Sequence, residues 1–308
     1  MDRSDEPVRQ GTEGDGIETS RVQPPKSGII WLASYPKSGN TWTRTFLHNL
    51  AKVKAGEDGA QSINTMNRYT VWDIAKPYYQ EVLGYEPDDS HRDQIAAARL
   101  EVQRRLADAL EGLIFAKTHA ALIMNRGQPT INYSVTSGAV YVIRNPLDVA
   151  ISFAHHMGRP VDDAIEIMGI RGIESPLAEI AVYEAYGSWS ENVLSWTRKP
   201  HHAIYVMRYE DMLAHPIETF GALARHLLQD ATPRELADAI ERSSFERLQS
   251  QEEATGFVER PKEAKRFFRE GRAGQWKAIL TSAQIERIVK DHGQQMARFG
   301  YHPDQLEK

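Results

Sequence analysis

The chain has 308 residues, of which 41% are hydrophobic and 26% charged, the balance of an ordinary soluble globular protein with one large core or two smaller ones. Its 37 lysines and arginines against 42 aspartates and glutamates give a formal charge of −5, which argues against nucleic acid as the main partner. The lack of cysteine excludes disulfides, thiolate metal sites and a cysteine nucleophile. Because it also fits a reducing compartment, and no stretch is a membrane span, we expect a cytoplasmic protein.

The first 26 residues differ from the rest of the chain. They have neither the apolar core of a secretory signal nor any hydrophobic periodicity, so we expect a disordered N-terminal arm over residues 1–26. No internal repeat and no obvious linker divides the following residues. We therefore expect a single domain over residues 27–302 and a short C-terminal tail over residues 303–308.

Short β-rich runs alternate with helical patterns along this domain. Continuous apolar strands separated by helices predict a parallel sheet that is covered on both faces. The expected fold class is therefore α/β, a P-loop-like three-layer fold with a central parallel sheet flanked by helices. The predicted strands are GIIWLAS at 28–34, LIFAKT at 113–118, GAVYVIR at 138–144 and HAIYVMR at 202–208.

The stretch ASYPKSGNTW, at 33–42, joins the first strand to an amphipathic helix. Such a loop directs backbone N–H groups and a helix N-terminus at an anion, and Gly39 permits a close approach. A nucleotide triphosphate loop would have glycine where Ser34 stands and lysine where Asn40 stands, whereas the lysine of this loop, Lys37, is displaced toward the strand. The loop therefore predicts a phosphate site but not the usual one.

Three helices are predicted further along the chain. Asn145-Pro146 and Thr232-Pro233 each offer a capping residue followed by proline, with an acidic residue two positions later. Residues 87–111 are rich in alanine, leucine, arginine and glutamate with apolar positions at helical spacing, which predicts one long surface helix. No spacing of histidines or carboxylates is typical of a metal site.

Three separated motifs carry a family resemblance. They are YPKSGNTW at 35–42, YVIRNPLDVAISFAHH at 141–156 and FFREGRAGQWKAILT at 267–281. Together they resemble the cytosolic-type sulfotransferases that use 3′-phosphoadenosine 5′-phosphosulfate (PAPS). The resemblance implies that residues 27–302 are one sulfotransferase domain. It also implies in-line transfer of a sulfuryl group from PAPS, without a metal ion, to a hydroxyl, or alternatively an amine, of a small-molecule or natural-product acceptor.

The resemblance assigns the phosphate loop to the 5′-phosphosulfate of PAPS. Negative charge grows on the oxygen that bridges sulfur and phosphorus, and Lys37 is the cation expected beside it. This role explains why the lysine is displaced from its position in a triphosphate loop. The donor-binding residues expected here are Lys37, Ser38, Gly39, Asn40, Thr41 and Trp42.

The resemblance also implies sites for the 3′-phosphate and the adenine of PAPS. Arg144, Ser152, Arg269 and Gly271 are expected to bind the 3′-phosphate, because an arginine fork and a hydroxyl suit that anion. Glu270 replaces the lysine usual in the family, and since its charge repels phosphate we expect it to point away. The residues expected around the adenine are Trp42 and Phe245 on its faces, with Ser243 and Tyr209 near its edge.

The catalytic base is expected at the end of the second predicted strand. Lys117-Thr118-His119 matches the K-T-H sequence of the family, and histidine is the side chain whose ordinary pKa suits removal of an acceptor proton. His119 is therefore the expected base. Lys117 would add positive charge at the transferring sulfuryl group.

The acceptor and the oligomeric state are less constrained. Segments 56–86 and 157–176 look like irregular lids over an acceptor pocket, and their aromatic residues suit a phenol, a steroid-like molecule, a lipid or an aryl peptide. The segment 277–286 resembles the family's dimer motif through Lys277, Thr281 and Glu286, with Ser282 in place of valine, so a homodimer is possible. Two other classes stay open, namely a P-loop nucleotide kinase or hydrolase and a donor-binding protein without catalysis.

Overall fold

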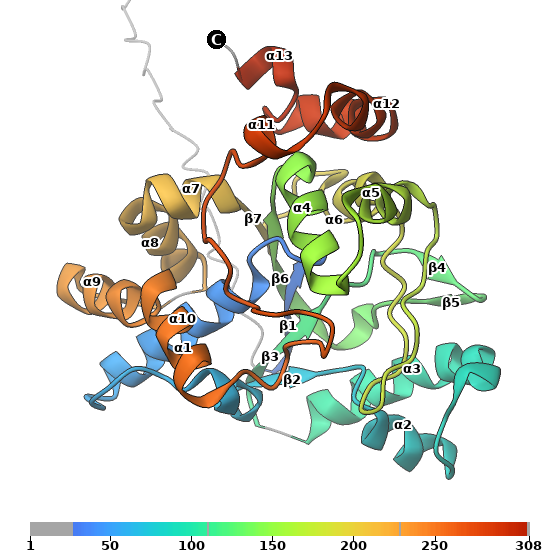
Figure 1. The fold of residues 1–308 in the computed structure, drawn as a ribbon. Helices are drawn as coiled ribbons and strands as arrows, with labels where there is room; N and C mark the ends of the chain where they lie inside the picture. The colour runs from blue at the N-terminus through green and yellow to red at the C-terminus, as the bar shows by residue number, and fades with distance from the viewer. Residues whose placement is uncertain (1–26, 110, 228, 307–308) are drawn as a thin grey trace, which may run out of the picture.

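A computed structural model of the chain describes residues 27–109, 111–227 and 229–306, so the expected arm at 1–26 lies outside the described residues. Figure 1 shows a central sheet with helices on both sides. All neighbouring strands of this sheet are parallel, which confirms the predicted fold class. Its strand order is β2-β3-β1-β6-β7, with β1 (Gly28–Ser34), β2 (Thr70–Trp72), β3 (Leu113–Thr118), β6 (Thr136–Ile143) and β7 (Ile204–Arg208).

The sheet is buried on both faces because side chains alternate between the faces and helices cover each of them. Trp31 of β1 and Tyr141 of β6 belong to one hydrophobic cluster, whereas Leu32 and Val142 belong to another. The first cluster includes residues of α3 (Arg92–Asp108), α4 (Pro146–Met157), α5 (Val161–Gly169), α6 (Trp189–Thr197) and α12 (Ser282–Arg298). The second includes residues of α1 (Asn40–Lys54), α7 (Tyr209–Ala214), α8 (Pro216–His226) and α9 (Pro233–Arg242).

The predicted helix starts at 145 and 232 are confirmed. The side chain of Asn145 accepts a hydrogen bond from the backbone N–H of Leu147 (3.0 Å), and α4 begins at Pro146. Thr232 accepts from the backbone N–H of Glu235 (3.3 Å), and α9 begins at Pro233. The predicted helix at 87–111 is shorter than expected, since α3 follows a separate 3-10 turn at Asp89–His91.

Two segments expected to be irregular contain regular structure, which corrects the prediction. Within 56–86, β2 pairs with β3 and α2 (Lys76–Leu83) follows it. Within 157–176 lies α5, whose Ile165 and Met168 are buried. The three residues of β2 are extended because they pair with β3. Such a tertiary contact cannot be predicted from sequence periodicity.

Short elements complete the description. A two-stranded antiparallel ladder joins β4 (Met124–Asn125) to β5 (Gln128–Pro129). Helices α10 (Phe245–Thr255) and α11 (Trp276–Ile279) flank a segment, residues 256–275, which crosses in front of the sheet in Figure 1. Residues 303–306, expected to be part of a tail, form α13 (Pro303–Leu306). Further 3-10 turns lie at Ile63–Arg68 and Tyr133–Val135.

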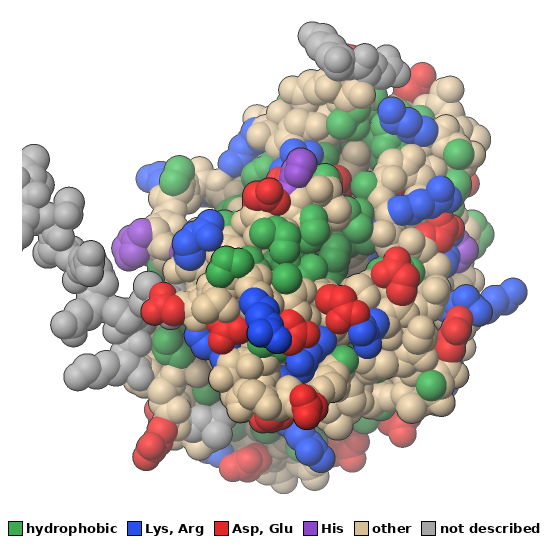
Figure 2. Space-filling view, turned by 90° about the vertical axis from the view of Figure 1, so that its left-hand side faces the viewer, with side chains coloured by type: hydrophobic (Ala, Val, Ile, Leu, Met, Phe, Trp, Pro, Cys, Tyr) green, Lys and Arg blue, Asp and Glu red, His purple; other side chains and the backbone are tan. Residues whose placement is uncertain are grey.

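The surface mixes both signs of charge. Figure 2 shows the side of the molecule that carries α8 and α9, where hydrophobic side chains gather at the centre and lysines, arginines and acidic residues surround them.

Among the helices of the described part of the chain, none combines the length and the apolar character needed to cross a bilayer. In the candidate dimer motif, Lys277, Thr281 and Glu286 are exposed, and the homodimer stays a prediction.

Candidate active site

The phosphate loop between β1 and α1 has a strained and specific shape. Lys37 has a φ of 65° and Gly39 a φ of 111°, both in the left-handed region. A side chain at Gly39 would place its Cβ 2.8 Å from the ring of Tyr209, so only glycine fits there. Asn40 donates from Nδ2 to the carbonyl of Leu32 (2.7 Å), which ties the loop to β1. The buried Oγ of Ser38 has no hydrogen-bond partner among the described residues.

Lys37 lies under the segment 256–275. Its Nζ is 3.6 Å from the centroid of the Phe267 ring, a cation–π contact. Burial of the ammonium group, together with the charges of Arg144 and Lys117, lowers the pKa of Lys37 to about 7. The amine is therefore poised to become fully charged when an anion binds beside it.

Arg144 follows β6 and joins the phosphate loop to the segment 256–275. It donates to the carbonyl of Lys37 (3.1 Å) and to that of Arg272 (3.2 Å), and only 6% of the residue is exposed. Its guanidinium carbon lies 4.2 Å from the centroid of the Tyr209 ring. The buried Nε of Arg144 has no partner among the described residues, so a donor remains for an anion.

In the loop at 269–275, the side chain of Glu270 differs from the expectation. Glu270 does not point away from the candidate 3′-phosphate site, because its carboxylate pairs with Arg269 on one side and with Arg272 on the other. The reason is electrostatic, since Arg269 and Arg272 offer the carboxylate two partners at once. Gly271 has a φ of 57°, and a Cβ there would lie 2.3 Å from the Phe245 ring, so its backbone packs directly against that ring.

Asp148 anchors the same loop and was not predicted. This buried residue in the first turn of α4 accepts hydrogen bonds from the backbone N–H groups of Gly274 (2.7 Å) and Trp276 (3.1 Å). Ser152 lies one turn further along α4 and is half-buried. The acid at the third helical position was visible in the sequence, but its partners lie more than 120 residues away in the chain.

The expected adenine residues share one region of the fold. Trp42 contacts the ring of Tyr209 edge-on, with centroids 5.9 Å apart, and its buried Nε1 has no partner among the described residues. Trp42 and Phe245 both pack against a third cluster, which includes Leu248, Phe257 and Phe268. Ser243 is fully buried, and its hydroxyl donates to the carbonyl of Ala239 (2.7 Å), which leaves the oxygen free to accept.

His119 lies directly beyond β3, next to the end of β1. Its Nδ1 is 2.9 Å from the carbonyl oxygen of Ser34, which can only accept, so Nδ1 carries the proton of the neutral ring and Nε2 is free to accept one. Burial and the charge of Lys117 lower the pKa of His119 to about 3, although the bond to Ser34 opposes them. The ring is therefore neutral at pH 7.

Two carboxylates, of the buried Glu184 and the largely buried Glu259, hold the residues around His119. Glu184 accepts from the backbone N–H of His119 (2.7 Å) and from the hydroxyl of Thr118 (3.3 Å). Glu259 lies 3.2 Å from Nζ of Lys117. Both acids stand in irregular segments, so sequence reasoning missed them, and only their tertiary contacts identify them.

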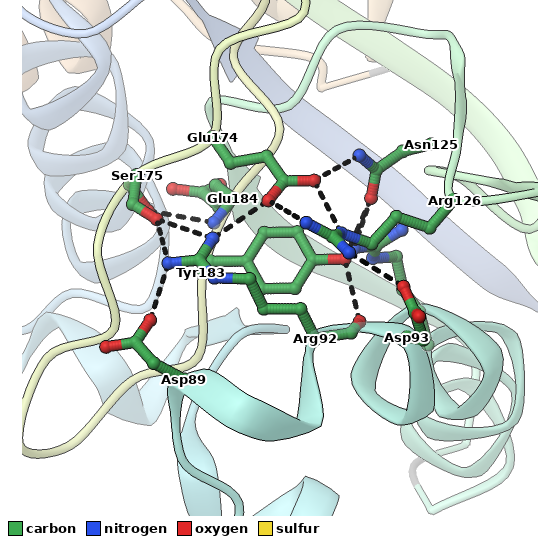
Figure 3. Close-up of polar contacts among 10 residues, drawn as sticks. Asp89, Arg92, Asp93, Asn125, Arg126, Glu174, Ser175, Tyr183 and Glu184 are labelled. Atoms are coloured by element: carbon green, nitrogen blue, oxygen red, sulfur yellow. Dashed lines mark hydrogen bonds and ion pairs between the residues drawn. The ribbon is translucent and has the colours of Figure 1, made fainter.

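The loop that carries Glu184 is clamped from outside, as Figure 3 shows. Glu174 accepts from Arg92 (2.8 Å), Arg126 (2.8 Å) and Asn125 (2.7 Å), which belong to α3 and to the β4–β5 hairpin. The hydroxyl of Tyr183 donates to Oδ1 of Asn125 (2.8 Å). These contacts fix the residue next to Glu184 and hence the approach of its carboxylate to His119.

A second histidine also lies near the site. Burial and then the charges of Lys37 and Lys117 lower the pKa of His156 to about 2, and its ring meets Phe267 edge-on at 6.0 Å. His155, its neighbour on α4, is exposed. Over the residues that the structure describes, no group of three or more histidines and carboxylates is arranged to hold a metal ion.

Comparison with known proteins identifies the class. Residues 28–300 match the sulfotransferase domain family. The chain therefore belongs to this family, and it is an enzyme of the PAPS-dependent sulfotransferase class.

Curated relatives agree with this assignment. The chain is 26% identical over 281 residues to flavonol 3-sulfotransferase of Flaveria bidentis, covering 85% of this chain and 79% of that protein. It is 27% identical over 281 residues to sulfotransferase 1A1 of Canis lupus familiaris, covering 88% and 84%.

Solved structures show the same fold. Mouse sulfotransferase SULT7A1, complexed with PAP, has a TM-score of 0.59 and 19% identity, covering 92% of this chain and 90% of that one. Retinol dehydratase in complex with retinol and PAP has a TM-score of 0.60 and 20% identity, covering 89% and 82%.

Proposed function

We propose that this protein transfers the sulfuryl group of PAPS to a hydroxyl of a small aromatic acceptor, with His119 as the general base. The observation that carries the proposal is the geometry of His119, whose Nδ1 is held by the Ser34 carbonyl so that Nε2 can accept a proton, with Lys117 nearby. Curated relatives named as sulfotransferases support the reaction class, and one of them names a flavonol as acceptor. Neighbours of the same fold that were solved with PAP support the nucleotide.

The residues present fit the donor. Oγ of Ser38 and Nε of Arg144 are buried polar atoms without a hydrogen-bond partner in the described part of the chain, which favours an anion as a ligand. Arg144 and Arg269 would hold the 3′-phosphate, with Ser152 and the backbone of Gly271. Trp42, Phe245, Tyr209 and Ser243 would hold the adenine. Thr41, Gly39, Asn40 and Ser38 would hold the 5′-phosphosulfate, which supplies the sulfuryl group.

The proposed chemistry needs one base and two cations. Nε2 of His119 accepts the acceptor's hydroxyl proton while the acceptor oxygen forms a bond to sulfur. The bond from sulfur to the 5′-phosphate oxygen breaks in the same line, and its electron pair leaves on the phosphate. Lys37 would balance the charge that grows on the leaving oxygen, and Lys117 would contact the transferring sulfuryl oxygens. The negative charge of a bound donor would also raise the low pKa of His119 and make it a better base.

Aromatic side chains near His119 favour an aromatic acceptor. Its ring meets Tyr186 edge-on at 6.3 Å, and Tyr186 lies 6.4 Å from Tyr35, which in turn contacts Phe153. Trp72 lies under the ammonium group of Lys117, with 5.0 Å to the ring centroid. Such rings provide the flat apolar contacts that phenols prefer. A lipid or peptide acceptor is the alternative.

An acceptor screen with sulfur-labelled PAPS tests this function. The panel contains phenols, flavonols, a steroid alcohol, a long-chain alcohol, an aryl amine and a tyrosine peptide, each with magnesium and with a chelator. We expect labelled product from at least one phenol, at the same rate with the chelator, and its loss in His119→Ala. Consumption of ATP that requires magnesium, with no sulfated product from any acceptor, would contradict the proposal and favour a P-loop kinase or hydrolase.

A further inference from the structure

A buried carboxylate lies among the cations of the active site. The two oxygens of Glu259 accept from the two terminal nitrogens of Arg44, at 2.9 and 2.8 Å, in a bidentate pair. One of the same oxygens lies 3.2 Å from Nζ of Lys117. Only 1% of the Arg44 side chain is exposed, and 12% of each of the other two side chains. A surface ion pair would be more exposed and less specific in geometry.

This cluster connects three separate parts of the site. Arg44 lies in the second turn of α1, and its Nη2 also donates to the hydroxyl of Thr41 in the first turn, at the end of the phosphate loop (3.3 Å). Lys117 stands on β3, two residues before His119. Glu259 belongs to the segment 256–275, which lies over both. One carboxylate therefore links a candidate phosphate ligand to a candidate catalytic lysine.

Glu259 is itself held from both sides of its segment. The neighbouring Val258 donates its backbone N–H to Oδ1 of Asn64 (2.9 Å). Further along, the backbone N–H groups of Phe267 and Phe268 donate to Glu252 of α10, each at 2.8 Å. These contacts fix the backbone on both sides of Glu259 and thereby restrict the position of its carboxylate.

We propose that Glu259 is a positioning residue for sulfuryl transfer, which holds the ammonium group of Lys117 toward the reacting centre and couples it through Arg44 to Thr41. The proposal rests on the proposed function above. Glu259 touches neither donor nor acceptor in this role. It acts through Lys117, whose four-carbon side chain has many rotamers and would otherwise be free to leave the position.

The charge of Glu259 matters as well as its shape. A carboxylate repels an anionic donor. A favourable effect of Glu259 on the neighbouring cations would offset this repulsion. Arg44 and Lys117 outweigh the effect of burial and hold the pKa of Glu259 well below its usual range, so it is ionised. Its charge raises the pKa of Lys37 and of His119, against the other cations nearby. One negative charge thus favours the protonated form of Lys37 although other cations surround it.

The test compares Glu259→Gln with wild type and with Glu253→Gln. Glutamine keeps the shape of the side chain but not its charge. Glu253 is a matched control, because it is also an acid of this region but forms an exposed pair with Arg266 at 3.2 Å. We expect kcat for the best acceptor to fall about 10²-fold in Glu259→Gln, since small misplacements of a catalytic group have effects of this size. At a pH well below the pKa of Lys37, the KM for PAPS should change less than about threefold, and so should kcat of the control variant.

The pH profile of kcat/KM for PAPS separates positioning from a structural role. The groups that act on Lys37 are Arg144 after β6, Lys117 on β3, His156 on α4, Glu252 on α10 and Glu259 itself. Since Glu259 raises the pKa of Lys37, its removal should shift the alkaline limb, near pH 7 in the free enzyme, to lower pH. Glu259→Asp keeps the charge and should lower kcat without moving the limb. Loss of folded protein alone would lower the rate at every pH equally.

A buried arginine left without its partner could prevent folding of Glu259→Gln. In that case the double variant Arg44→Gln/Glu259→Gln removes both charges and is expected to show the same loss of kcat and the same shift of the limb. A kcat within threefold of wild type, or an unmoved limb, in either soluble variant overturns the role of Glu259. Wild-type protein that binds PAP but sulfates no acceptor would instead contradict the proposed function.

Discussion

Nδ1 of His119 lies 2.9 Å from the carbonyl oxygen of Ser34, across the ends of two neighbouring strands of the sheet. Because a carbonyl cannot donate, this contact selects the tautomer in which Nε2 accepts a proton. The parallel pairing of β1 with β3 brings the two residues together although they are 85 positions apart in the chain. The strand register therefore sets the tautomer of the candidate base.

Replacing this base should separate turnover from donor binding. His119→Ala leaves the phosphate loop and Arg144 intact, so we expect transfer to fall by about 10² to 10⁴-fold while the affinity for PAP hardly changes. Single-turnover rates and calorimetry measure the two effects. The acceptor's hydroxyl must not already be ionised at the pH of the assay. Near-normal transfer by this variant would show that another group is the base.

Donor binding should depend on pH through Lys37. Its pKa in the free protein is lowered to about 7 by burial and by the charges of Arg144 and Lys117, and a bound phosphosulfate or phosphate raises it again. Affinity for PAP is then greatest below the free-protein pKa and decreases as pH rises above 7, by up to about tenfold per pH unit.

Calorimetry over this pH range, in buffers of different ionisation enthalpy, measures the uptake of the proton. Lys37→Arg is the control, because arginine stays charged and should flatten the profile. An equally steep decrease of affinity in that variant would mean that a different group takes up the proton.

Much of the fold could be predicted because its signals are local. The apolar run at 28–34 and the capping pair Asn145-Pro146 each determine an element through their own residues. The strand at 70–72 could not be predicted, because three residues acquire a β conformation only beside β3. Helix α5 was also not predicted, because glycines and prolines at the borders of its segment suggested a loop.

The site divides in the same way. The phosphate loop and the K-T-H sequence stand out as short motifs, and so His119, Lys37 and Lys117 could be named from the sequence. Glu184 and Glu259 could not, because each contacts its partner from a segment that has no regular pattern. The expectation that Glu270 points away was wrong, since the sequence does not show that Arg269 and Arg272 both pair with its carboxylate.

That pairing makes Glu270 a competitor of the donor. Its carboxylate occupies Arg269, one of the residues expected to bind the 3′-phosphate. Glu270→Lys should strengthen PAP binding by about 10-fold or more, because one charge-assisted hydrogen bond contributes roughly 1.5 to 3 kcal/mol. Binding of 5′-AMP, which has no 3′-phosphate, should not change.

The same charge reversal at Glu81 is a control for long-range electrostatics. Its side chain is 71% exposed on α2. Equal gains in PAP affinity from Glu81→Lys and Glu270→Lys would show that net charge alone is responsible.

Thr281 caps a helix, and it also belongs to the motif that a predicted homodimer would use. It caps α12 by accepting from the backbone N–H of Gln284 (3.3 Å), while the side chain of Gln284 accepts from the backbone N–H of Thr281 (3.0 Å). Thr281→Ala should lower the free energy of unfolding by about 1 kcal/mol through loss of this cap. Lys277→Glu leaves the cap intact and should weaken only a homodimer, as light scattering would show. A Thr281→Ala variant as stable as wild type would mean that the cap contributes little.

The central claim is that Arg144 and the loop at 269–272 form a site for the 3′-phosphate of the donor. Parallel calorimetric titrations of the full chain with PAP and with 5′-AMP test it without knowledge of the acceptor. Because Arg144, Ser152 and Arg269 would each contribute a charge-assisted contact, we expect PAP to bind at least about 10²-fold more tightly than 5′-AMP, and Arg144→Ala to reduce that difference by about 10-fold or more. Equal affinity for the two nucleotides would contradict the account.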